Sequence, residues 1–415
     1  MKYCYIIFDT IYSIGGSQKH TKAEYDYLKD KGYEVFILSH YKSKLFIEEF
    51  MQFEKLYFSF LAFNPFIFSK KQQNKLIQKI LNEIEFSKYE KIYIESHSVV
   101  FSLWGELLAK KLNAKHFVHN LSESLEITEP EFSFLNFKHE RKELAGIVPD
   151  SIQRLFKYYK QVPEEESYCL KAVSDYPIQP IVYKNKFKNN SDFKIGTIGR
   201  IDKDFVLKIS KEINQFALLH PEKLFSYMII GGCAQNEKKI IRSIKQNCYA
   251  PNLTCFITGR MYPIPTEIVD SCDLFISTSG SARISAQYGK LTIAVDTFSG
   301  FPIGIYPIET ADLIYSDFSS KKLIEYLDEI FFINGIDNDI YKFDVNAIQF
   351  SKENYLNQLT RKFNFILRNN ISTSYYQFED NFLIRRNDRI KKILVKFLGI
   401  KFFFCLFDAY KKLIS

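Results

Sequence analysis

Histidine side chains follow two apolar runs in the first half of the chain. Residues 91–94 lead into Glu95 and His97, and residues 116–118 lead into His119. A histidine titrates near neutral pH, so it can exchange a proton with a hydroxyl nucleophile or donate a hydrogen bond to a substrate. A structural histidine that bonds a backbone carbonyl is the alternative. The sequence predicts His119 as the first catalytic candidate and His97 as the second.

Carboxylates lie close to these histidines in the sequence. Glu95 and Glu123 could orient an imidazole or act as a base, and His20 ranks as a third histidine candidate. Another acidic pair, Asp270 and Asp273, precedes an apolar run instead of following it, so we interpret it as a helix end and a strand start. The sequence shows no set of metal ligands, and we predict neither a bound metal nor a cofactor.

Loops rich in glycine and serine follow other apolar runs. Gly15 and Gly16 follow the first run, and the segment Ser279-Gly280-Ser281 opens a predicted helix. Glycine lets backbone N–H groups approach a ligand closely, and a helix N-terminus favours negative charge. The Ser-Gly-Ser loop is therefore a candidate phosphate site, whereas the Gly-Gly pair could also be a tight turn without a ligand. Arg200 follows an apolar run and Gly199, and could bind an anion or form a structural ion pair.

Two series of alternating strands and helices position these residues. In the first half, strands are predicted at residues 3–8, 35–38, 91–94 and 116–118, with helices at about 18–31 and 102–112. In the second half, strands are predicted at residues 193–198, 227–230, 253–257, 274–277 and 292–296. Ligands of open α/β folds bind where parallel strands end, which is where the candidate residues lie.

The chain therefore divides into domains. We predict an N-terminal Rossmann-like domain over residues 1–180, a second over 193–345, and a helical, basic and aromatic tail over 346–415. The polar stretch 181–192 is the predicted linker. The fold class is α/β, with two Rossmann-like domains facing across a cleft. Residues 43–70, rich in Phe and Leu, are predicted to form a loop with a hydrophobic face, and residues 137–156 two helices.

Composition narrows the class of protein. The chain has 415 residues, 46% of them apolar, and a net charge of +8 that is spread along most of its length. It can bury large cores and is not disordered, and no nucleic-acid-binding motif accompanies the charge. The seven cysteines form no CxxC pair, which indicates a reducing compartment. No signal peptide or membrane-spanning run is present, so we expect a cytoplasmic protein.

The tail combines basic with apolar side chains. Residues 385–401 interleave Arg and Lys with Ile, Leu and Phe, and Gly399 interrupts a predicted helix. Such a helix can lie on an anionic membrane surface, which would make the protein peripheral at the inner membrane face. Alternatively, the helix packs on the N-terminal domain and its lysines form the solvated face.

The opening segment resembles the start of the GT-B-fold glycosyltransferases. A strand, a Gly-Gly loop, a polar helix and a second strand after "KGY" occur in that order, and the matching residues are Gly15, Gly16, Gln18, His20, Gly32 and Val35. The chain is similar in this respect to the large retaining family called glycosyl transferase group 1. In that family the Gly-Gly loop faces the cleft between the domains, and a histidine at a strand end lies near the transferred sugar. The resemblance implies these places for the Gly-Gly loop and for His119.

The second domain continues the resemblance. "IGTIGRIDKDF" is similar to the family segment whose Arg and Lys bind the donor diphosphate, which implies that role for Arg200 and for either Lys203 or Lys208. The physics agrees, since Arg beside Lys stabilises a leaving diphosphate. The expected donor-binding residues are Gly15, Gly16, Gly199, Arg200, Lys203, Gly259, Arg260, Ser279, Gly280, Ser281 and Ser285.

One family feature is absent. The family holds the donor sugar and ribose with a pair of glutamates, and this chain has Ser279-Gly280-Ser281, Ser285 and Gln287 in that segment. Hydroxyl groups do not replace a carboxylate that binds sugar hydroxyls. The donor and the stereochemical outcome therefore stay open.

We predict a metal-independent glycosyltransferase that moves a sugar from a nucleotide-diphosphate sugar to a saccharide or lipid-linked saccharide acceptor, in surface polysaccharide biosynthesis. Its partners would be these two substrates and an anionic membrane, with no nucleic acid. The alternatives are a nucleotide-sugar 2-epimerase on the same fold and a non-catalytic GT-B partner subunit.

Overall fold

The computed structural model places most of the chain in two compact units. Unit 1 comprises residues 1–175 and 351–414, and unit 2 comprises residues 176–350. Glu123 lies outside the residues that the structure describes, which are 2–12, 14–40, 45, 47–121, 126–148, 151–172, 178–182, 187, 190–233, 236–311, 318–348, 352–368, 374–378, 382 and 385–414.

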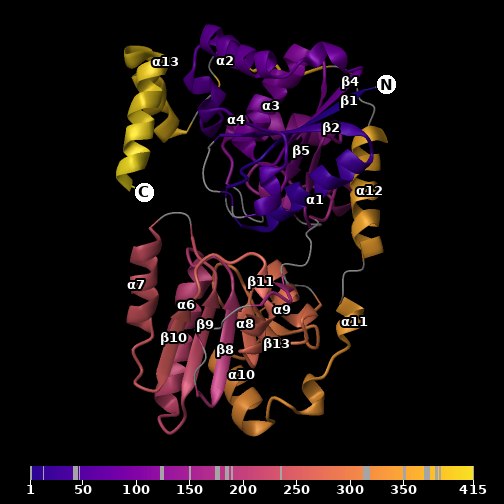
Figure 1. Cartoon of the computed structure of the whole chain (residues 1–415). Coiled ribbons are helices and arrows are strands. Elements are labelled where there is room, and N and C mark those ends of the chain that lie inside the picture. Colours follow the sequence, from indigo (N-terminus) through magenta and orange to yellow (C-terminus); the bar gives the residue numbers. More distant parts are fainter. Residues whose placement is uncertain are drawn as a thin grey trace. The chain divides into compact units, whose positions relative to one another are not determined.

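Unit 1 is built on a parallel six-stranded sheet with the order β3-β2-β1-β4-β5-β6. Figure 1 labels β1, β2, β4 and β5 of this sheet. The strands are β1 (Tyr3–Phe8), β2 (Tyr33–Ser39), β3 (Lys55–Tyr57), β4 (Lys91–Ser96), β5 (Lys115–Asn120) and β6 (Leu144–Gly146). The helices are α1 (Gly16–Asp30), α2 (Lys70–Glu83), α3 (Val99–Leu112), α4 (Glu129–Glu140), α5 (Ser151–Phe156), α12 (Lys352–Arg368) and α13 (Arg386–Ile414). Short 3-10 helices lie at Glu48–Met51, Ser59–Ala62, Pro65–Ile67, Phe86–Lys88 and Glu164–Glu166.

Unit 2 has a six-stranded sheet of order β10-β9-β8-β12-β13-β14 and a two-stranded sheet of β7 and β11. The strands are β7 (Ile178–Gln179), β8 (Phe193–Ile198), β9 (Phe225–Ile230), β10 (Leu253–Ile257), β11 (Ile264–Pro265), β12 (Leu274–Ser277), β13 (Leu291–Val295) and β14 (Pro302–Tyr306). The helices are α6 (Asp204–Leu219), α7 (Glu237–Asn247), α8 (Thr266–Asp270), α9 (Ser279–Gln287), α10 (Leu323–Asp328), α11 (Val345–Ile348), a π-helix (Glu329–Ile333) and a 3-10 helix (Asp339–Tyr341).

Local sequence explains where several elements begin and end. Ser69 and Gln72 form a capping box at the start of α2, and Asn113 ends α3 in the left-handed conformation. Gly32, with φ of +82°, lies between α1 and β2, where an L side chain would be strained. The predicted strands at 3–8, 193–198, 253–257 and 274–277 are confirmed to the residue, and α8 ends at Asp270 before β12, as predicted.

Three predictions were wrong in detail. Residues 302–306 form β14, which runs antiparallel to β13 instead of belonging to a parallel series. The described part of residues 43–70 contains β3 and three 3-10 helices rather than one loop, and most of its aromatic rings are buried, while Tyr57 and Phe58 are half-buried. Trp104 anchors this segment, because its indole N–H donates to the Phe63 carbonyl at 2.8 Å. Residues 137–156 contain the short strand β6 between two helices.

The tail packs on unit 1. Helix α13 is kinked at Gly399, which has φ of +74°, and its buried side chains Val395 and Phe403 join the core of unit 1. The Phe403 and Phe407 rings lie 5.1 and 4.5 Å from the Phe63 ring. This is the second of the two places that the sequence left open for the helix. Among the described residues, no helix is both long and apolar enough to cross a bilayer.

Candidate active site

Each large sheet has a point where the direction of its connections reverses. In unit 1 this point lies between β1 and β4, and in unit 2 between β8 and β12. Loops at the carboxyl ends of these strand pairs diverge, which leaves room for a ligand in open α/β sheets. Asp9 and His97 follow β1 and β4, whereas Gly199 and Ser279 lie close after β8 and β12.

His97 is held between two carboxylates in unit 1. Its Nε2 lies 3.0 Å from Glu95 Oε1, and its Nδ1 lies 3.4 Å from Asp9 Oδ2 and 3.2 Å from the Thr21 hydroxyl. Burial alone would lower the pKa of His97, but Asp9 and Glu95 raise it to about 9. His97 is therefore an imidazolium at neutral pH, and both ring nitrogens donate.

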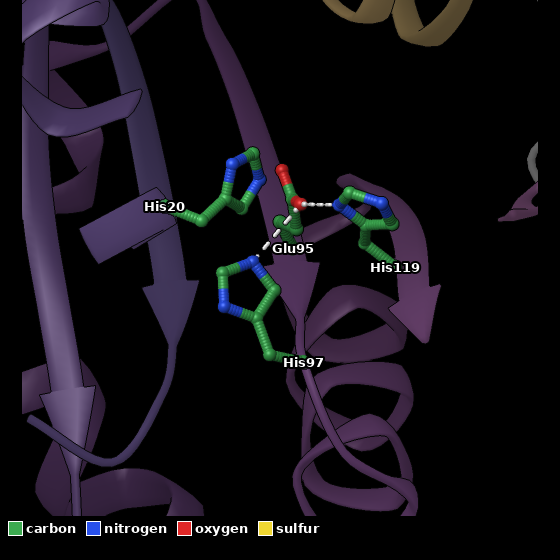
Figure 2. Close-up of side chains that lie close together, drawn as sticks. All are labelled: His20, Glu95, His97 and His119. Atoms are coloured by element: carbon green, nitrogen blue, oxygen red, sulfur yellow. Dashed lines mark hydrogen bonds and ion pairs between the residues drawn. The ribbon is translucent and has the colours of Figure 1, made fainter. Parts of the chain in front are cut away.

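His119 has the opposite character. Its Nε2 donates to the Leu170 carbonyl at 2.8 Å, and its Nδ1 has no hydrogen-bond partner among the described residues. Burial, followed by the charge of Lys362, lowers the pKa of His119 to about 4. The ring is therefore neutral, and the lone pair on Nδ1 points at Glu95 Oε1, 3.6 Å away (Figure 2).

Lys362, from α12, is a member of this cluster that sequence reasoning missed. Its ammonium is 2.6 Å from Glu95 Oε1, 2.7 Å from Glu24 Oε1 and 2.9 Å from His20 Nε2. Burial would lower the pKa of Lys362, but Glu24 and Glu95 raise it. Burial also raises the pKa of Glu95, yet Lys362 and the two nearby histidines hold it well below its usual value. Lys362 therefore stays protonated and carries a positive charge.

Asp9 and Glu24 were also missed, and His20 was ranked low. A periodicity signal existed, because Lys362 lies on the same helical face as the buried residues Leu359, Phe363 and Ile366. A lysine on an apolar stripe needs a buried anion as its partner. The sequence does not show which anion, since Glu95 is 267 positions away.

The Gly-Gly loop joins the cluster through Asp9. Gly15 precedes α1 and Gly16 opens it, and a side chain at Gly16 would meet nothing within 4 Å. Ser17 and Thr21 in the first turns of α1 donate to the Asp9 carboxylate. The loop therefore lies at the carboxyl end of β1, beside the histidine cluster.

In unit 2, Arg200 lies at the carboxyl end of β8. Its side chain is 48% exposed, and its Nε lies 3.3 Å from Asp202 Oδ1, so the guanidinium remains accessible to solvent. Lys203 immediately precedes α6, and Lys208 instead donates to the Phe298 carbonyl at 2.6 Å. Of the two lysines that the resemblance allowed, Lys208 thus has its ammonium bound to a backbone carbonyl, so Lys203 is the better candidate for binding a ligand.

The Ser-Gly-Ser segment forms the first turn of α9, directly after β12, the strand that pairs with β8. Ser279 has φ of +45°, and its hydroxyl is buried without a hydrogen-bond partner among the described residues. Gly280 is exposed and Ser281 half-buried. Ser285 is fully buried and bonds Thr292 and the Ala282 carbonyl, so its hydroxyl faces the interior of unit 2.

Glycines bring the strand ends of unit 2 close together. A Cβ at Gly231 would lie 1.8 Å from the Gly199 carbonyl oxygen, so this position requires glycine. Gly259 has φ of +76°, and the guanidinium of Arg260 donates to the Cys233 carbonyl. Gly199, Gly259 and Arg260 thus lie along the edge that carries Arg200.

Comparison with known proteins defines the class of fold. No protein-family model matches the chain, and no curated protein matches it. Solved structures do: a glycosyltransferase from Rickettsia africae ESF-5 is 17% identical with a TM-score of 0.64, over 89% of this chain and 99% of that one. The chain therefore has the GT-B fold, as predicted.

A second similar structure is Anabaena HepE. In complex with UDP and glucose it is 11% identical, with a TM-score of 0.55 over 88% of this chain and 97% of that one. In complex with UDP-glucose it is 13% identical, with the same TM-score over 87% and 99%.

Proposed function

We propose that this protein is a glycosyltransferase. It would transfer a sugar from a nucleotide-diphosphate sugar to a saccharide or lipid-linked saccharide acceptor, in the assembly of a surface polysaccharide. The observation that carries the proposal is the switch point of unit 2, where accessible Arg200 follows β8 and the Ser279 loop opens α9 after the adjacent strand β12. Both features favour a phosphate ligand.

The chemistry of this edge suits a diphosphate leaving group. Negative charge grows on the diphosphate as the glycosidic bond breaks, and a guanidinium that is already in place stabilises it. Arg200 and Lys203 would supply this charge, so we propose that transfer itself needs no metal. HepE was crystallised with UDP-glucose, which makes UDP-glucose the first donor to test.

We place the acceptor near unit 1. His97 and His119 flank Glu95 at the carboxyl edge of the sheet, with Asp9 tying His97 to the Gly-Gly loop. In this proposal one of the two imidazoles exchanges a proton with the acceptor hydroxyl or bonds the transferred sugar.

Turnover decides the proposal. The full-length protein is incubated with UDP-, GDP-, dTDP- and CMP-linked sugars, with and without lipid-linked and oligosaccharide acceptors, and released nucleotide is measured. Acceptor-dependent release is expected for one donor. Acceptor-independent conversion of the sugar would favour the epimerase, and binding without any conversion would favour the non-catalytic subunit.

We also propose that α13 contacts an anionic membrane. One stripe of the helix is buried on unit 1, and the remaining surface exposes apolar side chains beside lysines: Ile390, Ile393, Leu394, Phe397, Leu398, Phe402 and Leu406, with Lys392, Lys396 and Lys401. Packing on unit 1 and membrane contact therefore use different faces of one helix.

A further inference from the structure

We propose that His20, Glu95, His97 and His119 form a binding site for one divalent transition metal ion such as Zn²⁺, and that the Lys362 ammonium fills this site when no metal is bound. Each of the four residues offers one ligand atom, these atoms lie within 4.8 Å of one another, and all four residues are buried. Figure 2 shows the three imidazoles arranged around the Glu95 carboxylate. Nitrogen and carboxylate ligands in this number suit tetrahedral Zn²⁺.

In two of the histidines, the ring nitrogen that faces away from Glu95 already has the kind of hydrogen-bond partner that is usual for a metal-binding histidine. His119 donates from Nε2 to the Leu170 carbonyl, and His97 turns Nδ1 towards Asp9 and Thr21. A ligating histidine usually bonds a carbonyl or carboxylate with its second nitrogen, which fixes the ring. The inner nitrogens, His97 Nε2 and His119 Nδ1, both face Glu95 Oε1, at 3.0 and 3.6 Å.

Two buried atoms of this cluster lack a hydrogen-bond partner within the described residues. These are His119 Nδ1 and Glu24 Oε2, which lies 3.7 Å from His97 Nε2 and 3.8 Å from His20 Nε2. Buried polar atoms are normally satisfied, so an orphan lone pair beside a carboxylate indicates a missing cation. One ion between the four ligands would satisfy His119 Nδ1 and bring Glu24 close as a counter-charge.

Lys362 shows that this point already attracts a positive charge. Its ammonium touches Glu95, Glu24 and His20, but it leaves His119 Nδ1 unbonded. A lysine has a flexible four-carbon stem and can withdraw without moving its helix, whose Phe363 ring packs on Tyr5 and Tyr33. Burial and the nearby Glu95 raise the pKa of Glu24 to about 8, so Glu24 is protonated at neutral pH. On exchange the ammonium leaves, His97 Nε2 and Glu24 each release a proton to solvent, and the ion's two charges are balanced by Glu24 and Glu95.

The metal ligands include Glu95, His97 and His119, which the proposed function places near the acceptor. Metal binding is measured without a sugar donor, so the two proposals can fail separately. The metal site is built from residues of unit 1 alone, whereas Arg200 belongs to unit 2. If a metal is bound, His97 and His119 act as ligands and not as proton carriers.

The test is a Co²⁺ titration of the metal-stripped full-length protein, followed by visible absorption and competed with Zn²⁺. We expect one Co²⁺ per chain with the strong absorption of a low-coordinate ion. Losing the group that hydrogen-bonds a metal ligand lowers metal affinity by about 10- to 100-fold. Losing the ligand itself, in His119→Ala, should therefore weaken Co²⁺ binding by about 100-fold or more. The control His220→Ala removes a half-buried histidine of unit 2 and should bind as the wild type does.

Lys362→Met tests the exchange. Removing the competing ammonium raises the fraction of chains that can accept metal, so Co²⁺ should bind about tenfold tighter or more. If Lys362→Met does not fold, the wild type and the two histidine variants still decide the site. Absence of saturable binding in the wild type, or equal affinity of His119→Ala and His220→Ala, overturns the site. Metal binding that is unchanged in folded Lys362→Met overturns the exchange.

Discussion

At the scale of residues, unit 1 holds a second buried charge network beside the histidine cluster. Lys138 lies 2.7 Å from Glu106 and 2.8 Å from Glu143, and His116 Nδ1 lies 2.7 Å from Glu106. Burial alone would raise the pKa of Glu106, but Lys138 and His116 lower it to about 2. A buried carboxylate with two cationic or hydrogen-bonding partners stabilises the fold only while it is ionised.

The first prediction is a pH-dependent loss of stability in Glu106→Gln. The folded pKa of about 2 lies below the ordinary 4.5, so the contribution is complete above 4.5 and is lost as pH falls towards 2. The shift corresponds to about 3 kcal/mol at pH 7 and roughly half of that at pH 3. Urea unfolding of the wild type and Glu106→Gln across this pH range measures the difference in their free energies of unfolding. Exposed Glu83→Gln is the control, and a difference that stays constant with pH would contradict the assignment.

The second prediction concerns His119. If its imidazole takes part in transfer, His119→Ala should lower kcat by about 100-fold or more and leave nucleotide affinity unchanged. Steady-state kinetics beside nucleotide binding separate the two quantities, with His220→Ala as the matched control. Near-normal turnover would give His119 a structural role and leave His97 as the candidate.

At the scale of elements, α13 contributes side chains both to the core of unit 1 and to the protein surface. Val395, before the kink at Gly399, and Phe403, after it, are both buried in the core of unit 1. Deleting the helix would therefore expose the core of unit 1. Substitutions on its outer face are the better probe of a membrane role.

The third prediction is salt-sensitive binding to vesicles that contain anionic lipid. Each lysine near such a surface contributes about 1 kcal/mol, so the variant Lys392→Glu/Lys396→Glu/Phe397→Ser should bind at least ~30-fold more weakly. Lys211→Glu/Lys245→Glu changes two exposed lysines of unit 2 and is the charge-matched control. Sedimentation at rising salt measures both. Equal binding of the two variants would leave α13 with its packing role alone.

Sequence reasoning succeeded where the signal is local. Parallel strands such as β8, β10 and β12 are short apolar runs followed by glycine or polar residues, so their bounds were predicted to the residue. It failed for β3 and β6, which have three residues each, and for β14, whose antiparallel direction depends on its neighbour β13. Glu95, His97 and His119 were found because strands end there, whereas Lys362 reaches them only through tertiary packing.

At the scale of the whole molecule, the chain combines a GT-B fold with two chemically different strand edges. The edge of unit 1 is buried and densely charged, and the edge of unit 2 is glycine-lined and presents an accessible arginine. The first suits proton or metal chemistry, and the second suits a phosphorylated ligand. This difference is the physical basis for assigning the donor to unit 2.

Nucleotide binding through Arg200 is the most direct test of that assignment. Thermal unfolding is measured with UDP, GDP, dTDP and CMP for the wild type, Arg200→Ala and the control Arg242→Ala, which removes an exposed arginine from α7. At 100 times its Kd a nucleotide adds ~2.7 kcal/mol of stability. We expect one nucleotide to stabilise the wild type and Arg242→Ala, and to stabilise Arg200→Ala much less at the same concentration. Equal stabilisation of all three proteins, or none by any nucleotide, would contradict the assignment.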